Sequence, residues 1–147
     1  MTTEKVSLGV AGNPVAHSLS PDIHHGFARS LGNEVNYQRL CFPRDGFKVG
    51  ASKFFAVGGL GLNVTVPFKR EACDYASRLD PVAAAAGAVN TLAMQHGEVV
   101  GYNTDGIGLV RDLLVRHGVV LSQTSVLILG AGGACQGIIR PLLDAGV

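Results

Sequence analysis

The chain has 147 residues, of which 47% are hydrophobic and 16% charged, and its mean hydropathy is +0.29. These values are typical of a compact domain with a real core and exclude a disordered chain. Twelve basic and eleven acidic residues give a net charge of +1 with no run of like charge, so nothing favours nucleic acid or an anionic membrane as a partner.

The cysteines and the longest apolar runs indicate the cellular compartment and the kinds of partner to expect. No stretch reaches the ~18 uninterrupted apolar residues of a membrane span, so we expect a cytoplasmic protein whose partners are small molecules or a second copy of itself. Cys41, Cys73 and Cys135 are far apart and form no Cys-x-x-Cys pair, which favours buried free thiols over a disulfide or a metal site. The five histidines show no zinc-type spacing, so no metal is expected.

Strand-like and helix-like segments alternate with short connections up to about residue 103. The pattern predicts strands at 6–12, 36–42, around residue 63, at 88–94 and at 98–103, the last two joined by a turn at His96-Gly97. It predicts helices at 20–31, 47–57, 69–79 and 81–86. Alternation of this kind predicts an α/β domain at 1–103 with a mostly parallel open sheet flanked by helices.

The loop His17-Ser18-Leu19-Ser20-Pro21 leads into the first predicted helix, with Ser20 as the expected N-cap and Pro21 at the first helical position. An apolar stripe follows at Ile23, Phe27 and Leu31. Free N–H groups at a helix amino terminus bind anions, so the two serine hydroxyls are candidates for a carboxylate site. The alternative is that Ser20 only caps the helix and Ser18 is solvated.

The stretch Gly61–Lys69 combines a strand with a cluster of polar groups at its end. Period two places Leu62, Val64 and Val66 on one face, and Asn63 and Thr65 on the other. Pro67 cannot donate to a sheet and should end the strand just before Lys69. Ligands bind outside the carboxyl ends of strands in open α/β sheets, so a polyhydroxylated substrate is one interpretation, and an edge strand with a solvated polar face is the other.

Two further polar residues lie at element boundaries. Asn90 is an amide among apolar neighbours in a predicted strand, and it needs partners from a turn backbone or from a ligand. Asp105 follows the candidate cap Thr104 in the first turn of a helix whose apolar positions are Ile107, Val110, Leu113 and Leu114. The helix dipole favours the ionised carboxylate there, so Asp105 either meets Lys69 or only caps the helix.

A strand, a glycine turn and a helix are predicted near the carboxyl terminus. Ser125–Leu129 is typical of a buried strand, and a helix follows through Leu143. The turn between them resembles the dinucleotide fingerprint, in which glycines let a pyrophosphate approach backbone N–H groups, but Cys135 occupies the third glycine position. The residue that would bind the ribose, expected about 20 residues later, lies beyond Val147. The turn residues are Gly130, Ala131, Gly132, Gly133 and Ala134.

Five motifs in this order resemble shikimate dehydrogenase. They are Gly12-Asn13-Pro14 with Ser18-Leu19-Ser20-Pro21, then Asn63-Val64-Thr65-Val66-Pro67-Phe68-Lys69, Gly87-Ala88-Val89-Asn90-Thr91, Asn103-Thr104-Asp105-Gly106 and Gly130-Ala131-Gly132-Gly133-Ala134. The resemblance covers essentially the whole chain but only about the first half of that family's usual length, and it implies reversible reduction of 3-dehydroshikimate to shikimate with NADPH in aromatic amino-acid biosynthesis.

The resemblance also implies a role for each motif residue. Lys69 and Asp105 would be the catalytic pair, and both would also contact the substrate. The substrate carboxylate would bind Ser18 and Ser20, whereas its ring hydroxyls would bind Asn63, Thr65, Asn90 and Asp105. The NADP pyrophosphate would bind Gly130, Ala131, Gly132, Gly133 and Ala134. Residues 104–147 would then be a linking helix and the start of a Rossmann-type NADP domain.

Two alternatives remain beside this hypothesis. One is a quinate/shikimate dehydrogenase of broader specificity, although such enzymes often carry Thr at the position of Ser20. The other is a catalytically silent shikimate-binding fragment, because only one turn of the cofactor site is present. We expect this chain to bind shikimate weakly and to have little dehydrogenase activity of its own. The apolar faces of 125–143 should leave that segment mobile or packed against another copy, as in a homodimer.

Overall fold

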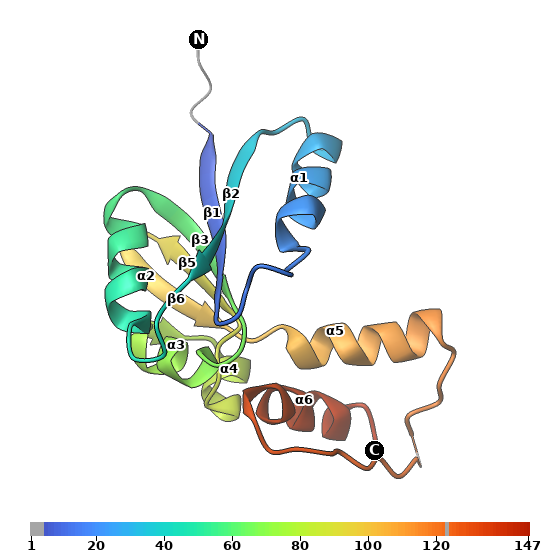
Figure 1. The fold of residues 1–147 in the computed structure, drawn as a ribbon. Helices are drawn as coiled ribbons and strands as arrows, with labels where there is room; N and C mark the ends of the chain where they lie inside the picture. The colour runs from blue at the N-terminus through green and yellow to red at the C-terminus, as the bar shows by residue number, and fades with distance from the viewer. Residues whose placement is uncertain (1–4, 123) are drawn as a thin grey trace.

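The computed structural model describes residues 5–122 and 124–147 and places them in one mixed sheet with helices around it (Figure 1). The strands are β1 (Val6–Gly12), β2 (Val35–Cys41), β3 (Gly59–Val64), β4 (Arg78–Leu79), β5 (Thr91–Gln95) and β6 (Glu98–Tyr102). The helices are α1 (Ser20–Ser30), α2 (Phe47–Ala56), α3 (Lys69–Tyr75), α4 (Pro81–Ala86), α5 (Asp105–Arg111) and α6 (Gly133–Asp144), and a π-helical turn, η1 (Asp112–Arg116), continues α5.

The sheet has the strand order β2-β1-β3-β5-β6-β4. Three of its neighbouring pairs are parallel, namely β1 with β2, β1 with β3, and β4 with β6. The other two, β3 with β5 and β5 with β6, are antiparallel. This arrangement confirms the predicted α/β fold with a mostly parallel open sheet, and it places β3 in the interior between β1 and β5.

Apolar residues pack on both faces of the sheet. The larger cluster lies under α2, α3 and α4, and its fully buried members include Phe47, Leu62 and Phe68. The rings of Phe47 and Phe68 are 5.3 Å apart, so the residue that precedes Lys69 is held in the core. A smaller cluster of Val10, Val15 and Tyr37 lies on the opposite face, on which α1 is placed in Figure 1.

The boundaries of β3 differ from the predicted pattern at one position. Leu62 and Val64 are buried as expected, but β3 ends at Val64 and the side chain of Val66 is 65% exposed. The chain turns at this point, because Phe68 N donates to the Thr65 carbonyl at 3.0 Å. Alternation predicts burial only within a strand, so the period-two rule fails once the backbone leaves the sheet.

The start of α1 also differs from the prediction. Ser20 is the first residue of the helix and is not its cap; Leu19 occupies the cap position without a side-chain hydrogen bond. The apolar stripe exists, but Ile23, Phe27 and Leu31 are at least half exposed and do not reach the core. Helical periodicity identified the helix correctly, but it could not show whether another element covers that face.

The middle of the chain follows the prediction with two changes. The β5–β6 hairpin turns at His96 and Gly97, both of which have positive φ, as a tight two-residue turn requires. Asn90 lies just before β5 and not within it. Helix α3 ends at Tyr75, and residues 78–79, which were expected to be helical, form β4 beside β6.

The predicted strand at 125–129 is not formed. These residues belong to no strand and pair with none of the described strands, and Leu127 and Leu129 are more than 80% exposed. A strand exists only beside a partner, and the described sheet offers none there. The helix expected after the glycine turn is present as α6, which packs on α5 (Figure 1).

Three further observations concern the cysteines, membrane-spanning helices and metal sites. Cys41 is exposed and Cys73 and Cys135 are half-buried, so the expectation of buried thiols was wrong, although all three are free. Within residues 5–122 and 124–147, no helix has the length and apolar character to cross a membrane. The same residues contain no group of three or more histidine, cysteine or acidic side chains suited to a metal ion.

Candidate active site

A pocket of about 320 Å³ opens at the carboxyl ends of β1 and β3. It gathers every residue for which the sequence suggested a substrate contact. These are Ser18, Ser20, Asn63, Thr65, Lys69, Asn90 and Asp105. Its remaining lining includes His17 and His24, which the sequence did not single out. The volume is at the lower end of the range for small-molecule sites, and the lining is mostly polar, which fits a small polar ligand.

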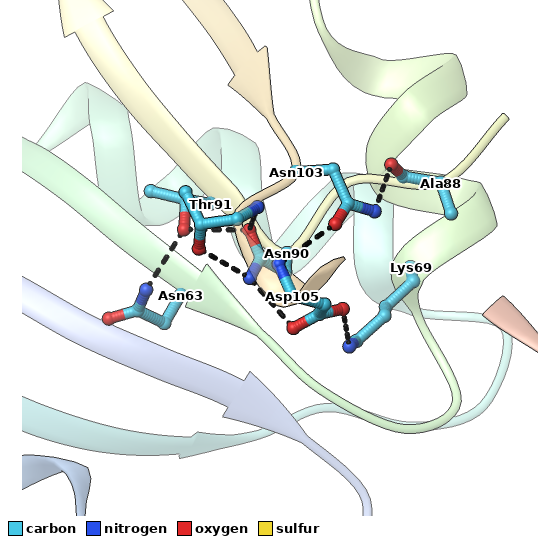
Figure 2. A network of polar contacts seen from close by, with 8 residues as sticks. Asn63, Lys69, Ala88, Asn90, Thr91, Asn103 and Asp105 are labelled. Atoms are coloured by element: carbon cyan, nitrogen blue, oxygen red, sulfur yellow. Dashed lines mark hydrogen bonds and ion pairs between the residues drawn. The ribbon is translucent and has the colours of Figure 1, made fainter. Parts of the chain in front are cut away.

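Lys69 and Asp105 form an ion pair in this pocket (Figure 2). Each is the first residue of its helix, Lys69 in α3 and Asp105 in α5. Their side chains are only 14% and 25% exposed, so solvent screens the pair less than it would at the surface. The α5 dipole favours the carboxylate at its first turn. The pair therefore places a proton-carrying ammonium and a fixed negative charge side by side.

Asn90 holds the Asp105 carboxylate from the other side. Its Nδ2 donates to Asp105 Oδ1 at 2.9 Å and to Thr104 Oγ1 at 2.9 Å. Its Oδ1 accepts from the Thr104 backbone N–H at 3.1 Å and from the Thr91 hydroxyl at 3.0 Å. All four hydrogen-bonding positions of this amide are thus occupied within the protein, and its partners are polar groups in or next to the pocket and not the apolar neighbours that the sequence suggested.

Asn63 is held by two residues to which the sequence analysis gave no role. Tyr37 donates its hydroxyl hydrogen to Asn63 Oδ1 at 2.7 Å, and Asn63 Nδ2 donates to Thr91 Oγ1 at 3.1 Å. Thr91 belonged to a quoted motif but had no expected role, and Tyr37 lies on β2, outside every motif. The structure explains both contacts, because Asn63 pairs directly with Thr91 of β5, and because β2 and β3 lie on either side of β1.

The side chain of Asn103 holds the start of α5 in place. It is buried, with 1% of its surface exposed, and its Nδ2 donates to the Ala88 carbonyl at 2.9 Å. Its Oδ1 accepts from the backbone N–H of Asp105 at 3.1 Å. Asn103 therefore does the capping expected of Thr104, whose hydroxyl instead accepts from Asn90. Figure 2 shows Asn103 beside Ala88, with Lys69 and Asp105 next to it.

The two serines lie next to each other at the start of α1. Ser18 Oγ accepts from the Ser20 backbone N–H at 3.2 Å, and the two hydroxyl oxygens are 3.1 Å apart. Arg39 Nε donates to the Ser18 carbonyl at 2.8 Å and so connects this loop to β2. The hydroxyls point into the same pocket as Lys69. The serines can therefore offer two hydroxyl groups beside a helix amino terminus, the arrangement that favours an anion.

Two titratable groups near the serines have altered proton affinities. His24 stacks on the ring of Tyr37 with centroids 4.4 Å apart, and burial lowers the pKa of His24. Burial raises the pKa of Tyr37 to about 12. Both shifts disfavour the charged form, since a partly buried ring loses the water that would solvate its charge. His24 and Tyr37 therefore form a neutral aromatic wall beside Asn63.

The glycine turn lies against Lys69. A Cβ placed on Gly133 would be 3.1 Å from the Cβ of Lys69, so α6 begins directly beside Lys69. Gly130 has a φ of +114°, Gly132 occupies the cap position of α6, and neither glycine has a heavy atom within 4 Å of where its Cβ would be. An open turn before an uncapped helix fits a pyrophosphate.

Known proteins resemble this chain in sequence. The pattern of the family described as "Shikimate dehydrogenase substrate binding domain" matches residues 10–92. A protein of Cupriavidus taiwanensis named "Shikimate dehydrogenase (NADP(+))" is 56% identical over 135 residues, which cover 92% of this chain and 46% of that protein. The chain spans about half the length of the curated relatives it matches.

Solved structures give the same result. Shikimate dehydrogenase of Aquifex aeolicus superposes with a TM-score of 0.91 at 36% identity, over 99% of this chain and 55% of that one. Shikimate 5-dehydrogenase of Thermus thermophilus, solved with NADP(H) and shikimate, gives a TM-score of 0.86 at 36% identity, over 97% and 53% of the two chains. The sequence pattern, the fold and the pocket thus agree, and the chain belongs to the shikimate dehydrogenase substrate-binding domain family.

Proposed function

We propose that this chain is the substrate-binding part of an NADP-dependent enzyme that interconverts 3-dehydroshikimate and shikimate. In this proposal residues 1–103 form the substrate domain, and 104–147 form a linking helix and the beginning of the cofactor domain. The observation that carries the proposal is the Lys69–Asp105 ion pair in a pocket that is otherwise lined by hydroxyls and amides. A polar pocket of this size suits a small cyclic acid with several hydroxyl groups.

The substrate carboxylate would lie against Ser18 and Ser20. Their hydroxyls are adjacent and lie at the amino terminus of α1, where the helix dipole favours negative charge. The ring hydroxyls would then extend toward the amide and hydroxyl groups of the opposite wall. The residues assigned to them are Asn63, Thr65, Asn90 and Asp105. Asn90 would have to exchange one of its four internal hydrogen bonds, such as the one to Thr104 Oγ1, for the bond to the substrate.

Reduction of a carbonyl group requires a proton for the oxygen as hydride reaches the carbon. Lys69 would donate that proton from its ammonium group to the developing alkoxide, and would regain one from solvent afterwards. Asp105 holds the ammonium in place and, through Asn90, is itself held in place. In the oxidative direction Lys69 would accept the proton of the carbinol hydroxyl, and Asp105 would stabilise the ammonium that forms.

The glycine turn of residues 130–134 would hold the pyrophosphate of NADP at the amino terminus of α6. The chemistry that NADP supplies when bound is hydride transfer at the substrate carbon. Because Gly133 adjoins Lys69, this turn lies on the side of the pocket that carries the proton donor. The close approach supports the assignment of the turn to the cofactor.

Calorimetric titration of this chain with shikimate, and separately with NADP, tests the binding part of the proposal. We expect heat from shikimate and little from NADP, because one glycine turn supplies only part of a dinucleotide site. Ser20→Ala should weaken shikimate binding, whereas Ser52→Ala, an exposed serine on α2, should not. Absence of shikimate heat, or equal effects of the two serine variants, would contradict the proposal.

A chimera tests the catalytic part. This chain would be joined to the carboxyl-terminal half of the Cupriavidus taiwanensis relative, which is 56% identical to it over the shared region. We expect NADP-dependent oxidation of shikimate, with quinate as the comparison substrate. A folded chimera that binds shikimate without oxidising it would contradict the assignment of Lys69 and Asp105, and equal oxidation of quinate would favour the broader-specificity alternative.

A further inference from the structure

A series of hydrogen bonds runs from the aromatic wall of the pocket to the ion pair. Each link is a donor and an acceptor at 2.7–3.1 Å, apart from the final ion pair with Lys69. The series connects Tyr37, Asn63, Thr91, Asn90 and Asp105, in that order, and it is called the hydrogen-bond series below. Figure 2 shows its last four members. Tyr37, at its far end, is not part of the proposed chemistry.

The direction of every hydrogen bond in the series is set from the Asp105 end. An ionised carboxylate only accepts, so Asn90 must turn its Nδ2 toward Asp105. The backbone N–H of Thr104 only donates, and it points to the other end of the same amide, Asn90 Oδ1. The Asp105 carboxylate, which only accepts, and the Thr104 N–H, which only donates, thus require the same orientation of the Asn90 amide.

The same reasoning extends to the remaining members. Because Asn90 Oδ1 is an acceptor, Thr91 must donate its hydroxyl hydrogen to it, and the Thr91 oxygen is left to accept from Asn63 Nδ2. Asn63 therefore turns its Oδ1 toward Tyr37, which must donate. This leaves Asn63 Nδ2 with one N–H for a ligand in the pocket, because His24 lies close enough to Asn63 Oδ1 to use its second lone pair.

We propose that Tyr37 is a positioning residue, which holds the Asn63 amide so that a ligand hydroxyl accepts from its remaining N–H. The inference rests on the proposed function, because it concerns how Asn63 meets shikimate. The stacking of His24 on the ring of Tyr37 suits this role, because it limits the movement of the ring. The Tyr37 hydroxyl, whose pKa burial raises to about 12, is a hydrogen-bond donor at neutral pH, as an ordinary phenol is.

The variant Tyr37→Phe removes the hydroxyl and keeps the ring. We expect shikimate binding to this chain, measured by calorimetry, to weaken roughly 3- to 10-fold, as the loss of one hydrogen bond implies. Tyr75→Phe is the matched control, because its hydroxyl lies outside the pocket and only contacts Ser52 at 3.4 Å. In an Asn63→Ala background, Tyr37→Phe should have no further effect. Equal weakening in both backgrounds, or none in either, overturns the proposal.

A second measurement does not depend on the ligand. Hydrogen exchange of the Asn63 side-chain amide, followed by NMR on the chain alone, should become faster in Tyr37→Phe and should be unchanged in Tyr75→Phe. A merely structural Tyr37 would leave this signal unaltered, and that result overturns the proposal. If the unmodified chain binds no shikimate, the proposed function fails, and the exchange measurement alone then decides whether Tyr37 holds Asn63.

Discussion

Gly106 of α5 and Gly137 of α6 lie in contact, and a Cβ on Gly106 would meet the carbonyl oxygen of Gly137 and the ring of Pro141. A Cβ on Gly137 would in turn be 2.7 Å from the Asn103 amide nitrogen. Since Asn103 caps the turn that carries Asp105, α6 packs directly on the residue that supports the Asp105 carboxylate. Two small residues make that close approach possible.

The first prediction concerns this contact. Gly106→Ala should lower the free energy of unfolding by roughly 1–3 kcal/mol, because the new methyl group overlaps backbone that cannot move freely. Gly108→Ala, two residues further along α5, meets no atom within 4 Å and should instead stabilise the helix by about 0.5–1 kcal/mol. Urea unfolding of both variants measures the difference. Similar effects of the two substitutions would show that α5 and α6 do not pack as described.

The second prediction concerns Lys69. In the chimera, Lys69→Ala should lower turnover by roughly 10²- to 10⁴-fold and change the Michaelis constant for shikimate far less, as expected for the loss of a proton donor. Lys53→Ala, an exposed lysine on α2, should leave both constants unchanged. Steady-state kinetics measure the two constants. A rise in the Michaelis constant with unchanged turnover would make Lys69 only a binding residue.

The third prediction concerns Asn103. Asn103→Ala leaves the Ala88 carbonyl and the Asp105 N–H without their side-chain partner in a buried place, which should cost roughly 1–3 kcal/mol of stability. Asn33→Ala, at an exposed position, should change stability by less than about 0.5 kcal/mol. Thermal or urea unfolding compares them. If the two variants are equally stable, the buried amide does not support α5.

The fourth prediction concerns pH. Burial lowers the pKa of His24 in the folded protein below its ordinary value of 6.5, so the unfolded chain binds a proton more readily there. The contribution of neutral His24 to the free energy of unfolding is therefore fully present above pH 6.5, and it is lost as the pH falls below that value. His24→Phe keeps an aromatic ring on Tyr37 and cannot titrate.

The stabilities of wild type and His24→Phe should be compared by urea unfolding between about pH 7.5 and pH 5. Wild type should lose stability relative to the variant as the pH falls. A constant difference, or one that grows in favour of wild type at low pH, would contradict the shift. Circular dichroism at each pH checks that both proteins are folded before urea is added.

The sequence predicted most of the fold because local signals act over a few residues. Alternation and turn residues such as His96-Gly97 placed the strands, and helical periodicity placed the helices. The failures share one cause, which is dependence on distant partners. Val66 alternates correctly but lies beyond the end of β3, the stripe on α1 has no covering element, and residues 125–129 have no strand to pair with among the described residues.

The candidate site was predictable where motifs carried it. All seven expected substrate residues lie in one pocket, and their roles stay predictions until binding is measured. Tyr37 could not be found in the same way, because nothing in the β2 sequence marks a hydroxyl that reaches Asn63 on a strand two places away. Asn103 was quoted only as part of a motif, and its burial becomes visible only when α6 is placed above it.

The strand order also determines when the pocket can exist during synthesis. Val10 of β1 pairs with Asn63 of β3, and Asn63 pairs with Thr91 of β5. Each wall of the pocket can therefore form only after a segment much later in the chain has been synthesised. Such distant pairings form slowly compared with helices and hairpins. Ser18 leaves the ribosome early, but the ion pair that completes the pocket cannot close before Asp105 has emerged. A nascent chain arrested short of that residue should therefore have most of its sheet and an incomplete pocket.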